Sequence, residues 1–362
     1  MEFGYFTLSD NHYPNNARSA NQFVLEIREQ AILADRLGMH SVWIGEHHFD
    51  SLGVNSRPDL VLANIAAQTK NVRLAPAVTV LPLHHPVHIA ECWASLDLLS
   101  GGRVDFATGR GYDRNEYAPF GADFMKSAEI FEEGIDVLLK AWNSPGTWSH
   151  KGRFYDIPEM SITPKPVQKP LPFYVASFSK TSVDIAAKRG LNIVYAPFAA
   201  GMVFGGLDKA VATYRDACAA AGKKPGRAIC SYFIFIADDA KAEDYGRQTQ
   251  MDYFNHCVIR AFPQKPEDAP PTMQYFMKIV DILKNMKKED LSERSILLGP
   301  PAKIIETLKK VEASGVEEVI LYFNVGKKPH ALVKEQMQRF MAEIAPHFAG
   351  KHRQRAEEPT LR

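Results

Sequence analysis

An excess of charge of either sign is missing from this sequence of 362 residues. Its 43 lysines and arginines are nearly balanced by 42 aspartates and glutamates, which leaves a formal net charge of +1. Proteins that bind nucleic acid or an anionic membrane surface generally need a broad positive field. We therefore expect no nucleic acid and no membrane among the partners of this chain, and expect a small molecule or a second copy of the chain instead.

Cysteines are few, and long apolar runs are absent. No apolar run reaches the roughly 18 to 20 residues that span a bilayer, and the first residues, MEFGYFTLSD, lack the basic and then apolar pattern of a secretion signal. The spacing of the cysteines matches neither a zinc site nor a disulfide framework. We expect reduced thiols in a cytoplasmic protein. The four cysteines are Cys92, Cys218, Cys230 and Cys257.

Short β-rich runs alternate with longer amphipathic segments along nearly the whole chain. Eight strands separated by helices, with no signal for a reversal of direction, favour a closed parallel (β/α)8 TIM barrel, an α/β fold, over an open sheet. Runs such as VRLAPAVTV and EEVILYF are apolar almost throughout, as strands buried on both faces are. The strands are predicted at residues 2–8, 41–45, 72–80, 103–108, 172–176, 192–196, 228–237 and 318–323.

Two stretches interrupt this alternation. Residues 143–171 are rich in proline and predict an excursion on the surface, whereas residues 239–298, after the seventh strand, are far longer than a crossover helix needs. In a barrel enzyme the second insertion would lie beside the active site, where it forms either a lid or a surface appendage. We expect one domain over residues 1–350, carrying both insertions, and a disordered tail at 351–362.

The strongest local signal for chemistry is Glu46-His47-His48-Phe49, directly after the second predicted strand. Catalytic groups of a barrel lie at this end of the strands. An imidazole titrates near neutral pH, and it therefore exchanges protons readily during a reaction. Glu46 and His47 are the candidate catalytic residues, although a histidine pair at a strand end can also be purely structural.

Two further clusters have the composition of a phosphate site. After the fourth strand, glycines flank Arg110; a glycine such as Gly111 lets the backbone approach a ligand, and a guanidinium fits a phosphate with two parallel hydrogen bonds. After the fifth strand, Ser177, Ser179 and Ser182 lie where a helix begins, and free amides at a helix start also bind phosphate. Simple capping of that helix by a serine explains the serines equally well.

Three histidines within five residues raise the question of a metal site. They are His84, His85 and His88 in the segment VLPLHHPVHIAE. No cluster of carboxylates accompanies them in the sequence, and a turn that starts a helix at Pro86 explains the local pattern. We therefore expect no metal. A metal-dependent barrel hydrolase is also disfavoured because the first strand, FTLSD, lacks a His-x-His pair.

Taken together and in order, these motifs resemble those of the bacterial luciferase-like monooxygenases, which are flavin-dependent barrel enzymes. The resemblance runs from GYFTL at the first strand to ILYF near the end. It rests on four separate motifs: EHHF, VLPLHHPVHIAE, LSGGRVDFATGRGY, and the serine-rich turn before AAKRG. The alkanal-oxidising luciferase α subunit is a close match in pattern.

The resemblance implies a role for individual residues. His47 matches the histidine that assists flavin oxygenation, and Arg110 matches the arginine that grips the FMN phosphate. Ser179 and Ser182 match the hydroxyl groups that complete the phosphate site. The flavin ring rests in the family against the dipeptide matched by Ala77-Val78, whose peptide bond is often cis, and Glu116 takes the place of an acidic residue near the ring.

One departure from the luciferase pattern limits what is implied. Gly109 stands where luciferase has a cysteine near the flavin, so light emission is not implied. The aromatic residues of the second insertion are expected either to line a substrate pocket or to pack in the core. They are Tyr253, Phe254, Phe262 and Tyr275.

The activity implied is that of an FMN-dependent monooxygenase. No G-x-G-x-x-G fingerprint for NAD follows a strand, so reduced FMN (FMNH2) is expected from a separate flavin reductase. One oxygen atom of O2 would enter a small apolar or carbonyl substrate, and a homodimer through the second and third helices is expected. Two alternatives stay open: hydride transfer with a deazaflavin, and a flavin-binding subunit without catalytic activity.

Overall fold

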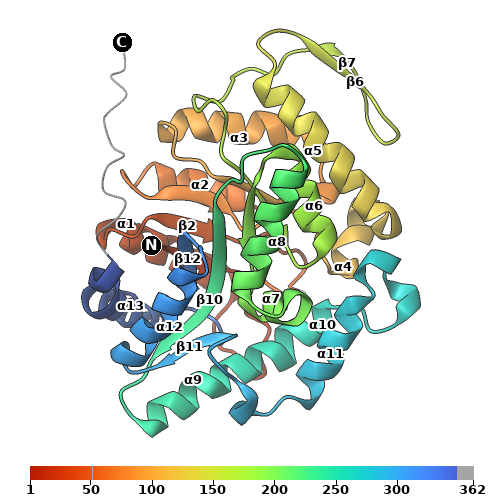
Figure 1. The fold of residues 1–362 in the computed structure, drawn as a ribbon. Coiled ribbons are helices and arrows are strands. Elements are labelled where there is room, and N and C mark those ends of the chain that lie inside the picture. The colour runs from red at the N-terminus through yellow and green to blue at the C-terminus, as the bar shows by residue number, and fades with distance from the viewer. Residues whose placement is uncertain (51, 349–362) are drawn as a thin grey trace.

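A ring of parallel strands forms the centre of the molecule (Figure 1). The computed structural model describes residues 1–50 and 52–348, so the tail predicted at 351–362 lies outside the described residues. The strands of the ring are β1 (Glu2–Thr7), β2 (Ser41–Ile44), β3 (Arg73–Pro76), β4 (Thr79–Val80), β5 (Phe106–Gly109), β8 (Phe173–Ser177), β9 (Asn192–Tyr195), β10 (Ala228–Ile236) and β12 (Glu318–Tyr322).

The ring closes because one extended run of chain serves both of its ends. The strand order is β3-β2-β1-β12-β10-β9-β8-β5-β4. β3 pairs with β2 and β4 pairs with β5, so the strand predicted at 72–80 is one run interrupted at residues 77 and 78. All pairs around the ring are parallel. This confirms the predicted (β/α)8 barrel.

Helices follow the strands and cover the outside of the ring (Figure 1). They separate the strands as the sequence predicted, and α3 ends at Gly101, whose φ of 72° is the left-handed conformation typical of a glycine C-cap. The outer helices are α1 (Ala20–Arg36), α2 (Pro58–Ala66), α3 (Pro86–Ser100), α5 (Ser127–Asn143), α6 (Lys180–Arg189), α8 (Leu207–Ala220), α12 (Pro301–Ala313) and α13 (His330–Arg339).

Alternate residues of the strands belong to two different cores. Tyr5 and Val42 pack with the outer helices, whereas their neighbours Phe6 and Trp43 lie inside the ring. Side chains of a strand alternate between its two faces, so the ring separates the two cores. The inner core also contains Phe254 from the second insertion. The insertion is therefore packed on the open end of the barrel and is continuous with its interior.

The first excursion, residues 143–171, contains a two-stranded antiparallel hairpin. It consists of β6 (Trp148–Lys151) and β7 (Asp156–Met160) and lies at the edge of the molecule beside α5 (Figure 1). Two X-Pro bonds of this excursion are cis, at Pro164 and Pro170.

The second insertion returns to the barrel through a strand that the sequence did not predict. β11 (Ile296–Gly299) pairs in parallel with the second half of β10, whose first half pairs with β12. β10 has nine residues and is long enough to pair with both. The apolar run of β11 was not recognised because it lies at the end of the stretch interpreted as an insertion, residues 239–298. The helices near the barrel mouth are α4 (Arg114–Tyr117), α7 (Pro197–Phe204), α9 (Ala240–Tyr253), α10 (Ile259–Ala261) and α11 (Tyr275–Asn285).

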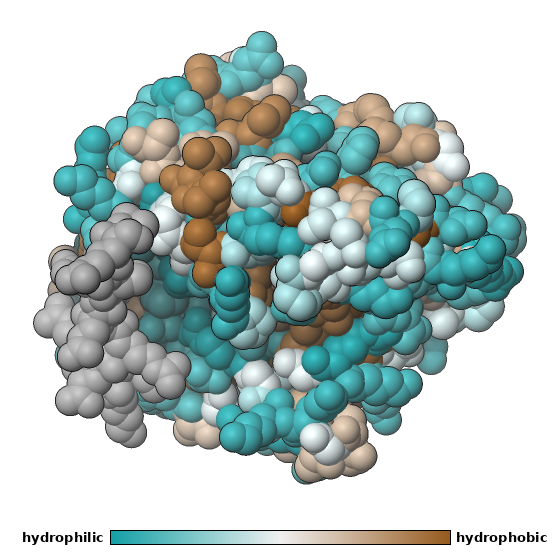
Figure 2. Space-filling view, turned by 90° about the horizontal axis from the view of Figure 1, so that it is seen from above, coloured by the Kyte–Doolittle hydropathy of each residue, from teal (hydrophilic) through white to brown (hydrophobic). Residues whose placement is uncertain are grey.

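Hydrophilic residues cover most of the face shown in Figure 2, and hydrophobic residues form separate areas between them. Large apolar side chains that are more than half exposed include Leu60 of α2 and Leu99 of α3. Within residues 1–50 and 52–348, no helix combines the length and the apolar character needed to cross a membrane. The four cysteines are all free thiols.

Candidate active site

A cavity of about 340 Å³ lies where the chain leaves the carboxyl ends of the ring strands. Parallel barrels carry their active sites at this end. With one exception, the residues predicted for the site line the cavity. Ser177 does not; its hydroxyl donates a hydrogen bond to the backbone oxygen of Ser179 at 3.3 Å. The predicted residues that line the cavity are Glu46, His47, Ala77, Val78, Arg110, Gly111, Glu116, Ser179 and Ser182.

His47 and Glu116 form a buried pair in the cavity wall. Nδ1 of His47 lies 3.1 Å from Oε1 of Glu116, and the same oxygen accepts a hydrogen bond of 2.8 Å from the backbone amide of His48. Burial lowers the pKa of His47, but the charge of Glu116 and the hydrogen bond to it raise it further, so the net pKa is raised. Within the described residues Nε2 of His47 makes no hydrogen bond. The ring is thus held at one nitrogen, and the other is available for a ligand.

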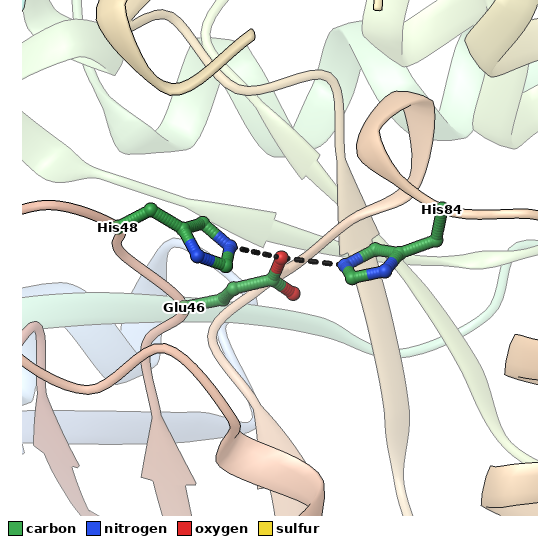
Figure 3. A group of neighbouring side chains, drawn as sticks. All are labelled: Glu46, His48 and His84. Carbon is green, nitrogen blue, oxygen red and sulfur yellow. Dashed lines mark hydrogen bonds and ion pairs between the residues drawn. The ribbon is translucent and has the colours of Figure 1, made fainter. Parts of the chain in front are cut away.

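Glu46 lies between two other imidazoles (Figure 3). Its Oε1 is 3.0 Å from Nε2 of His48 and 2.6 Å from Nε2 of His84, and its Oε2 accepts a hydrogen bond of 3.1 Å from the amide of Val80. Burial raises the pKa of Glu46, but the hydrogen bonds from the two histidines lower it further, so the net pKa is lowered. The carboxylate is therefore held ionised and fixed in position.

His84 was missed as a member of this site. The absence of a nearby carboxylate was one reason to dismiss the histidines at 84, 85 and 88 as ligands, but the fold brings the carboxylate of Glu46 against His84 from a segment 38 residues away in sequence. Sequence spacing cannot reveal such a contact. His88 and His85 lie beside each other, with ring centroids 5.7 Å apart, and neither lines the cavity.

The peptide bond between Ala77 and Val78 is cis, as the resemblance implied. It lies at the interruption between β3 and β4, and both residues line the cavity. Gly109 of β5 faces it closely: a Cβ atom added there would lie 2.7 Å from Cγ2 of Val78. The glycine therefore allows the backbone of β5 to pack closely against the side chain of Val78.

Arg110 has no anionic partner within residues 1–50 and 52–348. Its NH1 donates a hydrogen bond of 2.8 Å to Oγ1 of Thr272 in the second insertion, and no carboxylate within the described residues forms an ion pair with it. Burial lowers its pKa, because the charged guanidinium is partly removed from water. A partly buried, unpaired guanidinium beside a cavity fits a phosphate or another anion. Thr272 was not predicted, since nothing in the sequence connects it to Arg110.

Ser179 and Ser182 lie at the start of α6. Ser179 is the N-cap residue, whose Oγ accepts from the amide of Ser182 at 3.3 Å and lies 2.8 Å from Oγ of Ser182. Both serines and Thr181 line the cavity. Capping and ligand binding are compatible here, because a helix start presents further amides and a positive partial charge to a bound anion.

The second insertion supplies an apolar wall. The four aromatic residues predicted there as candidates all line the cavity, and Phe276 joins them. The ring of Phe262 lies 4.6 Å from that of Phe276 and 4.7 Å from that of Tyr112, which follows β5. The four predicted residues are Tyr253, Phe254, Phe262 and Tyr275.

Comparisons with known proteins find relatives that are similar in sequence and in fold. The family model described as luciferase-like monooxygenase matches residues 1–318. The oxygenase component of a flavin-dependent trigonelline monooxygenase from Acinetobacter baylyi is 24% identical over 344 residues, which cover 92% of each chain.

Two solved structures of similar fold contain different cofactors. One is a type II Baeyer-Villiger monooxygenase, the oxygenating constituent of 3,6-diketocamphane monooxygenase from Pseudomonas putida, in complex with FMN; it has a TM-score of 0.73 at 22% identity, over 96% of this chain and 98% of the other. The other is an F420-dependent secondary alcohol dehydrogenase bound to an F420-acetone adduct, with a TM-score of 0.73 at 16% identity, over 95% and 98% of the two chains. The fold thus serves both FMN and the deazaflavin F420.

Proposed function

The chain belongs to the luciferase-like monooxygenase family, and we propose that it is the FMN-dependent oxygenase component of a two-component system. The single observation that carries this proposal is the arrangement around the cavity. A proton-exchanging histidine held by a carboxylate, a cis peptide beside a glycine, and an unpaired arginine near a helix start lie around one space.

These residues fit FMN by their chemistry. Arg110 would form charge-assisted hydrogen bonds with the phosphate, and Ser179 and Ser182 would add hydroxyl donors at the start of α6. The flat ring would rest against Ala77-Val78, which line the cavity together with Gly109. Reduced FMN, when bound, supplies the two electrons with which one atom of O2 is reduced to water while the other enters the substrate.

The protein would contribute proton control and a dry environment. With Nδ1 directed to Glu116, His47 has Nε2 available to donate or accept a proton beside the ring. The aromatic wall from the second insertion would exclude water and receive an apolar or carbonyl substrate. The insertion would act as a lid, because Thr272 and the ion pair between Asp268 and Arg114 connect it to the loop after β5.

The name of the Acinetobacter relative, an oxygenase component, supports a separate reductase as partner. No dinucleotide fingerprint follows a strand in this chain, so reduced FMN would come from another protein. A homodimer is proposed through α2 and α3, whose outer faces expose Leu60 and Leu99. Light scattering coupled to size-exclusion chromatography tests it: L60E should yield monomers if the contact is real.

The proposed function is tested by mixing the protein anaerobically with chemically reduced FMN or with reduced F420, and then with oxygenated buffer. We expect tight binding of reduced FMN and a rate of reoxidation that differs from that of free FMN. H47A should change that rate, whereas H88A, outside the cavity, should not. Preferential binding of F420 without reaction with O2 would favour hydride transfer instead. If FMN binds but is reoxidised at the same rate as in buffer, the protein is instead a flavin-binding subunit without oxygenase activity.

A further inference from the structure

The Glu46 cluster connects the cavity with the surface of the protein. The side chain of His84 is 21% exposed, whereas that of Glu46 is 2% exposed and lines the cavity. Between them, Nε2 of His84 and Oε1 of Glu46 are only 2.6 Å apart (Figure 3). A partly exposed imidazole is thus hydrogen-bonded directly to a carboxylate in the cavity wall.

The distances between Glu46 and its two histidines are those of hydrogen bonds, in which each imidazole donates a proton to the carboxylate. The three ligand atoms lie within 4.8 Å of one another, and two histidines with a carboxylate are also a known donor set for zinc. A metal, however, requires unprotonated Nε2 atoms, whereas the separations of 2.6 and 3.0 Å from Oε1 are those of N–H···O hydrogen bonds. Oε2 is occupied by the amide of Val80 at 3.1 Å. Within the described residues no lysine or arginine pairs with this carboxylate, so the histidine protons are its partners.

The proposed reaction consumes one proton, which has to come from solvent. The anionic form of reduced FMN, O2, one substrate molecule and one proton give FMN, the oxygenated substrate and one water. Among the residues that the structure describes, Oε1 of Glu116 contacts Nδ1 of His47 and the amide of His48, and neither contact leads to an exposed titratable group. A proton that His47 gives up is therefore not replaced through this oxygen.

We propose that His84 and Glu46 form a proton relay from solvent to the cavity, an inference that rests on the proposed oxygenase function. A proton from water binds Nδ1 of His84, and the proton on Nε2 moves to Oε1 of Glu46. The resulting carboxylic acid releases its proton to the reacting groups in the cavity, and the neutral imidazole, after exchanging its tautomer, is ready for the next proton. His48 holds the carboxylate from its other side and keeps Oε1 directed at His84.

The first test uses the protein without cofactor. In protein labelled with nitrogen-15 at histidine, the Nε2 proton of His84 should give a strongly downfield-shifted NMR signal. E46Q should move that signal upfield, because an amide oxygen is a weaker acceptor than a carboxylate, whereas H88Q should leave it unchanged. A His84 signal that ignores E46Q would overturn the relay. Stoichiometric Zn²⁺ binding that is lost in H84A and kept in H88A would also overturn it.

The second test follows a single turnover of bound reduced FMN after oxygen is added. H84A should slow the proton-dependent step by about 10- to 100-fold while the Kd for FMN stays within about twofold, and added imidazole should restore the rate. H84Q serves as a second variant if H84A does not fold, and H88A is the matched control. A wild-type protein that does not react overturns the proposed function and the relay together. Normal reaction in the wild type with an equal rate in H84A, or a loss that imidazole does not restore, overturns the relay alone.

Discussion

Oε1 of Glu116 lies 3.1 Å from Nδ1 of His47, although the two residues are 69 positions apart in the sequence. The contact joins the loop after β2 to the short helix α4. Both side chains are buried, so the carboxylate determines the protonation of the imidazole more strongly than solvent does.

We expect E116Q to lower the pKa of His47. The substitution removes the negative charge of Glu116, which stabilises the imidazolium. Burial, which lowers the pKa of His47, is then no longer offset by that charge. If His47 is the acid in the reaction, activity falls as the pH rises through its pKa, and this fall should occur at lower pH in E116Q. Histidine NMR titration measures the pKa directly. E129Q changes a carboxylate of the cavity lining that makes no contact with His47 and should leave the titration unchanged.

Substitution of Arg110 should weaken the binding of FMN but not that of riboflavin, which has no phosphate. A charge-assisted hydrogen bond contributes about 1.5 to 3 kcal/mol, so R110M should raise the Kd of FMN roughly 10- to 150-fold. Fluorescence titration with both flavins separates the effect on the phosphate from an effect on the ring. R114A removes an exposed arginine that pairs with Asp268 and is the control. Equal losses for FMN and riboflavin would contradict a phosphate role.

G109A should disturb the wall formed by Ala77 and Val78. The new Cβ atom would lie 2.7 Å from Cγ2 of Val78, so one of the two residues has to move. Overpacking of this kind costs about 1 to 3 kcal/mol, and urea denaturation should show a loss of that size. Gly146 has nothing within 4 Å of its added Cβ, so G146A should change the free energy of unfolding by less than about 0.5 kcal/mol. Similar stability of both variants would show that the contact is unimportant.

Because of Lys328, the free energy of unfolding should change with pH above neutrality. Burial lowers its pKa from 10.5 to about 7. Between these values the unfolded chain binds more protons than the folded protein, so a rise in pH stabilises the fold. K328M should therefore raise the free energy of unfolding by roughly 2 to 4 kcal/mol at pH 6, and by less at pH 9. Urea denaturation at both pH values measures this. K327M, at the exposed neighbour, should show no such difference between the two pH values.

The sequence was sufficient to predict the barrel, because its strands and helices each produce a pattern over a few neighbouring residues. The apolar strands and the capping glycine at 101 are signals within a few residues of one another. Several cavity residues, such as His47, Arg110 and Ser179, could also be predicted, since they closely follow strands. Ser177 was grouped with its neighbours Ser179 and Ser182, but at the end of β8 its hydroxyl turns to the backbone of Ser179 and away from the cavity.

What the sequence did not indicate depends on contacts between distant segments. His84 meets Glu46 because the turn after β4 and the loop after β2 lie next to each other in the ring. Thr272 reaches Arg110 across 162 positions, from a part of the second insertion that no sequence motif connects to the barrel. β11 is recognisable only through its pairing with β10. Such contacts are determined by the folded backbone and have no signature in spacing.

The pairing of β11 with β10 also bears on how substrate range can change. The second insertion leaves the barrel after Ile236 and returns at Ile296, which pairs in register with Phe233 of β10. Both joints therefore lie on the same pair of neighbouring strands. The segment between them can be exchanged as a cassette with that of a related barrel, which would replace the aromatic wall while the residues around the proposed FMN site keep their places.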